Sequence, residues 1–421
     1  MSKRSIIRYV LLPTIVVILG GLAGWYMFLR GQTQATVNTD TGRGFNVGLP
    51  LGDFTGSGYS NLTGGNSPDA KQPAGPLPRL WQTSQAPVAG FSFTETGTST
   101  RLQFMDRGNG YLFSADFEAQ TLERITNTLM PKIYEAYISG DKVVARTADG
   151  SGVIRTFAGE VASTSPSEAP EEGGVRALEG ADMEGGISAM DMHPATGNLF
   201  YLMRSATGTV GYRAQWDSDK RTSAFSSAVS DWRPWLLPDD RVILLTKPAD
   251  GVLGYAYALR SNGTLASLIE PEPGLTILPR SGSSALIWGT SGGGGLALYA
   301  RVNSDATPTS LPIQTVADKC AWAPSSGEAS GSGSGQALFA YCGVPQAAQG
   351  GNFLGDWYRG ARHTTDSLWR VDVSAGTAEL VYAPSQGITL DMKDPAVDPS
   401  GEYIAFKNAR DESLWVLRIE Q

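Results

Sequence analysis

Five turns of one composition recur along this sequence, and each follows a short apolar segment. Each turn contains a proline followed by small polar residues, and most also contain a glycine. The turns occupy residues 193–197, 237–240, 278–282, 323–327 and 398–401. All intervals but the last are about 40 to 45 residues, the length of a propeller blade built from strands. The spacing therefore predicts an all-β propeller.

From residue 90 onward, short apolar or aromatic segments alternate with turns, which is typical of β-strands. The segments group into seven sets, which open at residues 91, 133, 187, 231, 275, 318 and 392. The last set has only three strands, and residues 79–84 are expected to supply the fourth and close the ring. We therefore predict a seven-bladed β-propeller over residues 79–421. A pair of β-sandwiches is the alternative.

The first 30 residues have the pattern of a membrane anchor. Lys3, Arg4 and Arg8 precede residues 9–29, which are apolar or small throughout. This stretch is long enough to cross a hydrocarbon core of about 30 Å. The basic residues favour a cytoplasmic N-terminus, so a single transmembrane helix over residues 1–30 would place the rest outside the cytoplasmic membrane. A cleaved signal peptide is the alternative, although residues 25–28 are bulky where a cleavage site needs small residues.

Residues 31–78 form a different kind of segment. They are rich in Gly, Ser, Asn, Thr and Pro and contain few large apolar side chains. Such a composition cannot bury enough apolar surface to fold alone. We predict a flexible linker between the anchor and the propeller.

The net charge restricts the class of partner. The whole chain carries a formal charge of −8, and the basic residues near the anchor leave the remainder more acidic. Nucleic-acid binding depends on Lys and Arg at phosphates. A nucleic-acid partner is therefore not expected.

The chain contains two cysteines, Cys320 and Cys342. If residues 318–324 and 336–345 are adjacent strands, the two side chains can point to the same face. In an oxidising compartment a disulfide is favoured over two buried thiols. No His or second Cys pair stands at metal-ligand spacing, so no metal site or cofactor is expected.

The sequence also resembles a known family. Turns of Pro, polar residues and Gly precede strands such as Leu199–Tyr201 and Tyr403–Phe406, and this resembles the WD40-like (PD40-type) repeats of TolB-type propellers across residues 79–421. The order of the anchor, the linker and five short segments is similar to that of uncharacterised membrane-anchored propeller proteins of small-genome bacteria; these segments are residues 87–90, 124–127, 319–322, 356–358 and 413–415. The resemblance implies the fold and no activity. The Gly-His and Trp-Asp pair of eukaryotic WD40 blades is absent.

Few residues in the chain are suited to catalysis. There are two histidines, His193 and His363, and no Gly-x-Ser-x-Gly elbow. His193 precedes a proline in a turn, which favours a structural role. We therefore expect no catalytic residues and a protein that is not an enzyme.

One insertion, residues 343–365, combines aromatic, basic and acidic side chains. Its candidate binding residues are Asp356, Trp357, Tyr358, Arg359, Arg362 and His363. Aromatic residues with Arg are typical of binding hot spots, and aromatic rings also stack on sugars. The alternative is that Trp357 and Tyr358 fold the insertion over the channel as a plug.

These observations predict a membrane-tethered propeller in the bacterial cell envelope that binds a protein partner or acts as an assembly platform. The alternative function is binding or processing of surface glycans through residues 343–365.

Overall fold

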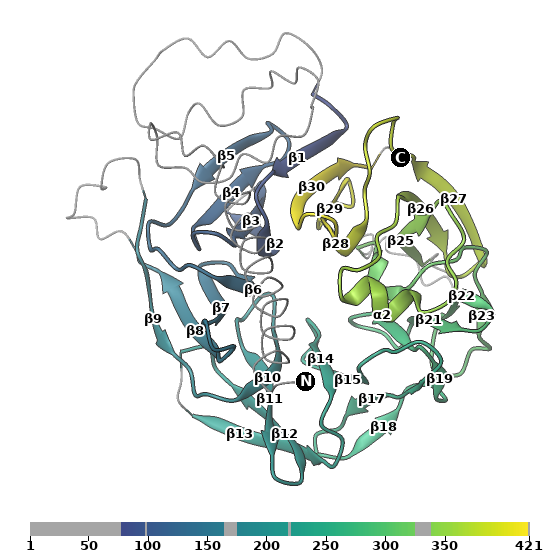
Figure 1. Cartoon of the computed structure of the whole chain (residues 1–421), viewed down its shortest axis with the longest axis horizontal. Coiled ribbons are helices and arrows are strands. Elements are labelled where there is room, and N and C mark those ends of the chain that lie inside the picture. The colour runs from purple at the N-terminus through teal and green to yellow at the C-terminus, as the bar shows by residue number, and fades with distance from the viewer. Residues whose placement is uncertain (1–76, 97–98, 164–174, 218–219, 325–337, 420–421) are drawn as a thin grey trace, which may run out of the picture. The chain divides into compact units, whose positions relative to one another are not determined.

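The computed structural model describes residues 77–96, 99–163, 175–217, 220–324 and 338–419. These residues form seven four-stranded antiparallel sheets, which are arranged in a ring (Figure 1). Figure 1 shows the first strands β2, β6, β10, β14 and β28 toward the centre of the ring. The predicted seven-bladed β-propeller is confirmed, and the alternative of two β-sandwiches is excluded.

The strands of each blade follow in chain order. Blade one contains β2 (Val88–Thr96), β3 (Ser99–Asp106), β4 (Leu112–Asp116) and β5 (Thr121–Arg124). Blade two contains β6 (Ile133–Ser139), β7 (Lys142–Ala148), β8 (Ile154–Val161) and β9 (Leu178–Asp182). Blade three contains β10 (Ile187–Met192), β11 (Leu199–Ser205), β12 (Gly208–Ala214) and β13 (Arg221–Ser227).

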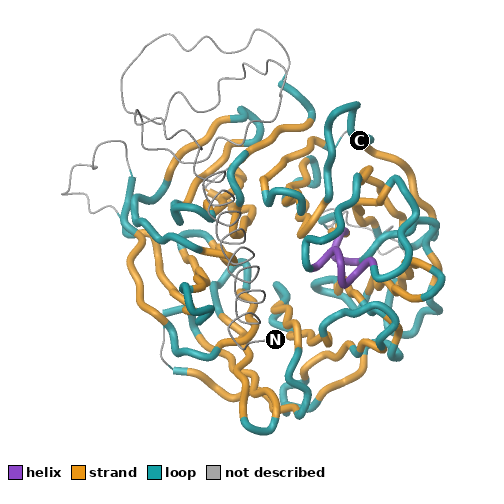
Figure 2. Tube along the Cα trace, viewed as in Figure 1, coloured by secondary structure: helices purple, strands orange, loops and turns teal. Residues whose placement is uncertain are grey.

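The next blades carry short additions to this pattern. Blade four contains β14 (Trp232–Leu236), β15 (Val242–Thr246), β17 (Ala256–Leu259) and β18 (Leu265–Ser267), with a separate ribbon of β16 (Leu253–Gly254) and β19 (Glu272–Pro273). Blade five contains β20 (Thr276–Pro279), β21 (Leu286–Gly292), β22 (Gly295–Arg301) and β23 (Thr309–Ser310). Blade six contains the 3-10 turn η1 (Ala317–Lys319), β24 (Cys320–Trp322), β25 (Phe339–Pro345), the helix α2 (Phe353–Tyr358), β26 (Asp366–Asp372) and β27 (Thr377–Tyr382) (Figure 2).

The seventh blade joins the two ends of the propeller. It contains β28 (Met392–Val397), β29 (Tyr403–Asn408), β30 (Ser413–Arg418) and, as its outer strand, β1 (Leu80–Ser84). β1 pairs antiparallel with β30, with Leu80 opposite Leu417. Because this pairing covers the edge of β30, the first described strand closes the ring of sheets.

The apolar pattern of the strands follows their position in the blade. The second strand of a blade packs between two neighbouring sheets, and in β7 and β15 four consecutive side chains are buried. In the sequence such strands are continuous apolar segments. An outer strand such as β5 alternates between exposed and half-buried residues, because only one of its faces is covered.

The alternation of strand direction gives the propeller two distinct ends. Connections between blades, and those between second and third strands, share the end that carries α2, which we call the α2 end. Connections between first and second strands lie at the opposite end, which contains the five proline turns and which we call the proline-turn end. β1 begins and β30 ends at the proline-turn end.

The proline turns bind neighbouring blades to one another. His193 in the turn of blade three lies with its ring Nε2 3.1 Å from the carbonyl oxygen of Pro238 in the turn of blade four. Arg241 donates through Nη2 to the carbonyl oxygen of Arg280, at 2.6 Å, in the turn of blade five. The repeat that identifies the fold in the sequence therefore also links its sheets.

Cys320 in β24 stands directly opposite Cys342 in β25, with their Cα atoms 4.0 Å apart, and the two form a disulfide. The predicted disulfide is confirmed.

The predicted anchor, residues 1–30, and nearly all of the predicted linker, residues 31–78, lie outside the described residues. Within the described ranges, no helix is long and apolar enough to cross a membrane.

Candidate functional site

The predicted site lies on the α2 end, where the insertion joins β25 to β26. Its helix α2 is attached to blade four by Asp250, in the connection after β15. The carboxylate of Asp250 accepts hydrogen bonds from the backbone N–H groups of Leu354, at 3.1 Å, and Gly355, at 2.9 Å. It also accepts one from the Ser291 hydroxyl at 2.6 Å. These contacts give the insertion a defined position.

Trp357 faces the interior of the propeller. Its side chain is 5% exposed, and it packs with Leu296, Val316, Phe353 and Leu354. The indole N–H donates to Asp391 Oδ1 at 2.9 Å. In this arrangement Trp357 has the packing of a core residue.

Beneath Trp357 lies a buried ion cluster that the sequence analysis missed. The Lys319 ammonium donates to Asp366 Oδ2 and Asp391 Oδ1, both at 2.6 Å, and to Thr364 Oγ1 at 2.8 Å. Lys319, Asp366 and Asp391 all have fully buried side chains. An ammonium group has three N–H donors, and each has an acceptor here. The cluster therefore holds the insertion in place. Every N–H donor of the Lys319 ammonium is occupied, so none is available to a ligand.

The two carboxylates of this cluster respond differently to burial. For Asp366, burial is the largest influence and raises its pKa above the ordinary value despite the nearby Lys319 charge. For Asp391, burial also favours the neutral form, but Lys319 and several hydrogen bonds outweigh it and hold the pKa below the ordinary value. Asp391 is therefore the carboxylate that stays ionised beside Lys319.

Tyr358, the last residue of α2, is hydrogen-bonded to Asp318 of η1. The residue is 41% exposed, and its hydroxyl group donates to Asp318 Oδ2 at 2.7 Å. The other Asp318 oxygen pairs with Arg233 of β14, whose guanidinium stacks on Trp235 at 4.6 Å. Burial of the hydroxyl and the charge of Asp318 raise the pKa of Tyr358 well above its ordinary value. Asp318 therefore bridges blades six and four: it accepts from the neutral Tyr358 hydroxyl of blade six and pairs with Arg233 of blade four.

The remaining predicted site residues differ in exposure. Arg359, whose side chain is 70% exposed, pairs with Asp356 at 2.7 Å. Arg362 donates to the carbonyl oxygen of Gly350 at 2.9 Å. His363 lies with Nδ1 3.3 Å from Asp391 Oδ2. The structure thus brings all six predicted residues onto one insertion, with Tyr358 and Arg359 the most accessible of them.

The α2 end also carries a feature that sequence reasoning missed. Of the nine exposed large apolar side chains in the described ranges, eight lie in or beside connections of the α2 end; they are Leu129, Val153, Ile154, Val229, Val252, Leu253, Tyr255 and Tyr358. Only Leu380, on the outer strand β27, lies elsewhere. A signal for this feature was present in the sequence: residues 252–255 are apolar and lie in a loop that contains glycines. The eight side chains belong to connections of blades one, two, three, four and six, so the α2 end holds most of the exposed large apolar side chains of the described residues.

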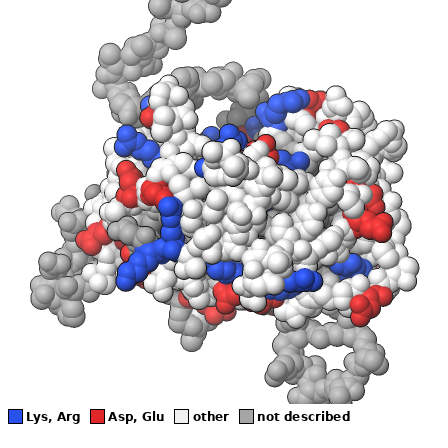
Figure 3. Space-filling model, turned by 90° about the horizontal axis from the view of Figure 1, so that it is seen from below, with Lys and Arg blue, Asp and Glu red and all other residues white. Residues whose placement is uncertain are grey.

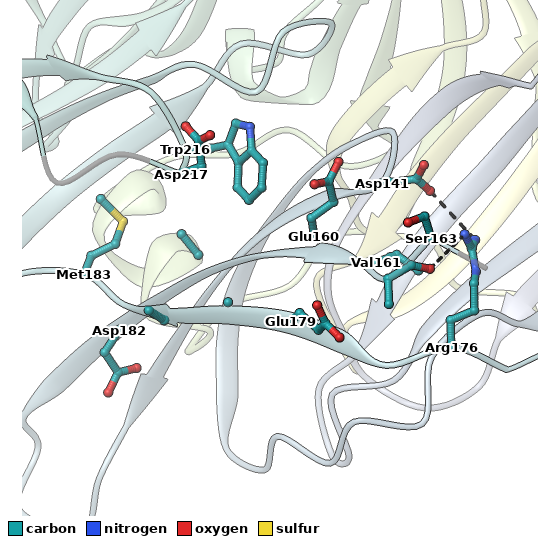
Figure 4. A pocket seen from close by; sticks show the side chains of 14 residues that line it. Asp141, Glu160, Val161, Ser163, Arg176, Glu179, Asp182, Met183, Trp216 and Asp217 are labelled. Atoms are coloured by element: carbon teal, nitrogen blue, oxygen red, sulfur yellow. Dashed lines mark hydrogen bonds and ion pairs between the residues drawn. The ribbon is translucent and has the colours of Figure 1, made fainter. Parts of the chain in front are cut away.

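A separate cavity of about 550 Å³ lies between β8 and β9 of blade two and the connection that follows β12 of blade three (Figure 4). Its lining includes five carboxylates: Asp141, Glu160, Glu179, Asp182 and Asp217. Arg176 lies 3.8 Å from Asp141, and Trp216 forms part of the opposite wall. The excess of negative charge makes this cavity unsuited to an anion.

In the part of the chain that the structure describes, no group of three or more His, Cys, Asp or Glu side chains could hold a metal ion.

No protein-family model matches the chain, and no curated protein matches its sequence. Among solved structures, it is similar to an auxiliary nutrient binding protein from Bacteroides thetaiotaomicron, at 10% identity and a TM-score of 0.42, over 80% of this chain and 70% of that one. It is also similar to the extracellular domain of a hybrid two-component system protein from B. thetaiotaomicron, at 14% identity and a TM-score of 0.43, over 80% of this chain and 38% of that one. A third is U3-55K, at 8% identity and a TM-score of 0.47, over 81% of this chain and 98% of that one. At this level these similarities assign neither ligand nor partner to the chain.

Proposed function

We propose that this protein is a membrane-tethered, extracytoplasmic β-propeller of the TolB-like type, which acts as a non-enzymatic protein-binding or assembly platform in the bacterial cell envelope. The observation that carries the proposal is the gathering of exposed apolar side chains on the α2 end. Isolated apolar side chains are common on protein surfaces, whereas eight of the nine in the described residues on one end favour that end as the docking surface.

The direction of the strands supports the same arrangement. The chain enters the propeller at the proline-turn end, where the first described residues, 77–79, precede β1. The apolar α2 end lies opposite this entry point. A linker attached to the proline-turn end leaves the α2 end free for a partner.

The surface charge agrees with a protein partner. The side of the propeller seen in Figure 3 is largely uncharged in its middle and carries Lys, Arg, Asp and Glu mixed toward its rims. A field of one sign, which would attract a nucleic acid, is not seen on this side.

Glycan binding is the alternative function, and it needs exposed aromatic faces. Trp357 is 5% exposed and Tyr358 is 41% exposed, so the insertion offers one accessible ring for stacking on a sugar. We therefore favour the protein partner.

The test uses two leucines that are equally exposed. Leu253 on the α2 end and Leu380 on β27 are each 53% exposed. Leu253→Glu should abolish in vivo crosslinking of the full-length protein to its partner, whereas Leu380→Glu should leave it intact. Equal crosslinking by both variants, or specific binding to a glycan array with no protein partner, would overturn the proposal.

The location has its own test. Protease added to intact spheroplasts should cut within residues 31–78 and release the propeller. A propeller that stays protected would place it in the cytoplasm and contradict the proposed location.

A further inference from the structure

A cavity of about 220 Å³ lies between blades four and five at the proline-turn end. Two arginines, Arg241 and Arg301, contribute to its lining. Apolar side chains form much of the rest; they are Ile243, Leu268, Pro279 and Leu286. It is remote from the apolar surface of the α2 end, and its chemistry is different.

Arg301, the last residue of β22, carries a charge that the protein does not neutralise locally. Its Nη2 donates to the carbonyl oxygen of Leu268 at 2.6 Å. Its Nε is buried and has no hydrogen-bond partner. Among the described residues, no carboxylate lies within ion-pair distance of Arg301, and burial lowers the pKa of the guanidinium while the charge of Asp305 opposes this. Arg301 as a whole is only partly buried, so the cavity presents a guanidinium that no carboxylate of the described residues pairs with.

Arg241 lines the same cavity and is held in a fixed orientation. Its Nε donates to Asp239 Oδ2 at 2.8 Å. Its Nη2 donates to the carbonyl oxygens of Arg280, at 2.6 Å, and Ser283, at 2.8 Å. These bonds use the side of the guanidinium that faces the proline turns, and within the described chain Nη1 has no acceptor. Such preorganisation suits recognition of a planar oxyanion.

The rest of the lining indicates the size and polarity of a ligand. Ile243 and Leu286 are fully or nearly fully buried, so this wall is apolar. Ser284 lies at the exposed mouth, where its hydroxyl oxygen accepts a hydrogen bond from the Ser304 N–H at 3.0 Å. The cavity therefore combines cationic groups, an apolar wall and a polar mouth, which is typical of small-molecule sites.

We propose that this cavity binds a small organic anion, whose carboxylate or phosphoryl group lies between Arg301 and Arg241 and whose apolar body packs on Ile243, Pro279 and Leu286. The anion supplies the counter-charge that Arg301 lacks. This site is independent of the docking surface on the α2 end, and its test is independent of any protein partner.

The test is calorimetric titration of the full-length protein with three probes: benzoate, its uncharged analogue benzamide, and inorganic phosphate. Benzoate should bind at least about tenfold more tightly than benzamide, because the guanidinium groups recognise the charge. Failure of both benzoate and phosphate to bind would overturn the site. Phosphate binding as tight as that of benzoate would overturn the organic part of the assignment.

Variants distinguish binding of the anion in the cavity from its nonspecific attraction to positive charge on the surface. Arg301→Gln should weaken benzoate binding at least about tenfold. Arg260→Gln removes the same charge from an exposed turn at the same end and should leave binding unchanged. If Arg301→Gln does not fold, Ser284→Asp keeps both arginines and should weaken binding by placing a carboxylate at the mouth. An equal loss in Arg301→Gln and Arg260→Gln, or no loss in Ser284→Asp, would contradict the proposal.

Discussion

Trp357 and Lys319 share one acceptor: the indole N–H of Trp357 and the ammonium of Lys319 both donate to Oδ1 of Asp391, at 2.9 and 2.6 Å. The ammonium also lies 4.9 Å from the centre of the Trp357 ring. One carboxylate therefore joins the inserted helix to the buried ion cluster of blade six. Removal of any of the three groups should disturb the other two.

The first prediction concerns this helix. Trp357→Ala should lower the free energy of unfolding by about 3–5 kcal/mol, because it leaves a cavity in a buried site and removes one of the hydrogen bonds to Asp391 Oδ1. Urea denaturation of the full-length protein measures the loss. Arg359→Ala, on the exposed side of the insertion, serves as the control and should stay within about 0.5 kcal/mol of wild type. If the two variants are equally stable, Trp357 is available for recognition after all.

The second prediction concerns the disulfide. Cys320 and Cys342 close a loop with a sequence separation of 22 residues, which corresponds to about 3 kcal/mol of stabilisation in the chain-entropy view. Cys320→Ser should lower the free energy of unfolding by about 2–4 kcal/mol, and reduced wild type should lose a similar amount. In wild type both cysteines should resist alkylation until reductant is added. Free thiols in protein prepared under oxidising conditions would contradict this.

The third prediction is a pH dependence from Asp191, in the central strand β10. Burial raises the pKa of Asp191 to about 7, although its carboxylate accepts hydrogen bonds from the N–H groups of Leu236 and Met192. In the unfolded chain an aspartate titrates near about 3.9. Between these values the folded state holds a proton that the unfolded state has lost, so stability falls as pH rises, by at most about 1.4 kcal/mol per pH unit.

The variant Asp191→Asn removes that titration. The difference in unfolding free energy, variant minus wild type, should rise between pH 5 and pH 7 and level off above about pH 7. Asp239→Asn is the matched control: the pKa of Asp239 lies below its ordinary value, chiefly because the bonds from Arg241 and Gly282 outweigh burial, so its difference from wild type should stay constant over this range. Parallel curves for Asp191→Asn and wild type would show that Asp191 does not titrate there.

The sequence predicted the blades because the signals for them are local. Proline turns such as residues 237–240 and 278–282 follow first strands at a regular interval, and the apolar second strands come next. The orientation of Trp357 depends instead on packing between blades five and six, which no local pattern encodes. The sequence places Trp357 on an insertion, but its composition does not determine the direction in which the side chain points.

The ion cluster was missed for a related reason. Asp366 lies 47 residues after Lys319 in the sequence, and Asp391 lies 72 residues after it. No spacing rule connects residues so far apart. A signal was nevertheless present, because Lys319 lies between apolar segments at the start of a first strand. A lysine in that position is buried only with partners.

The pairing of β1 with β30 has a consequence for how the protein is made. Arg79 and Arg418, which join through a hydrogen bond beside this pair, are 339 residues apart in the chain. β1 is among the first parts of the propeller to leave the ribosome, and its only partner strand is among the last. The nascent chain must therefore carry an unpaired strand through nearly the whole of its synthesis, and closure is a late, long-range step. During that interval the unpaired edge of β1 is open to pairing with another chain.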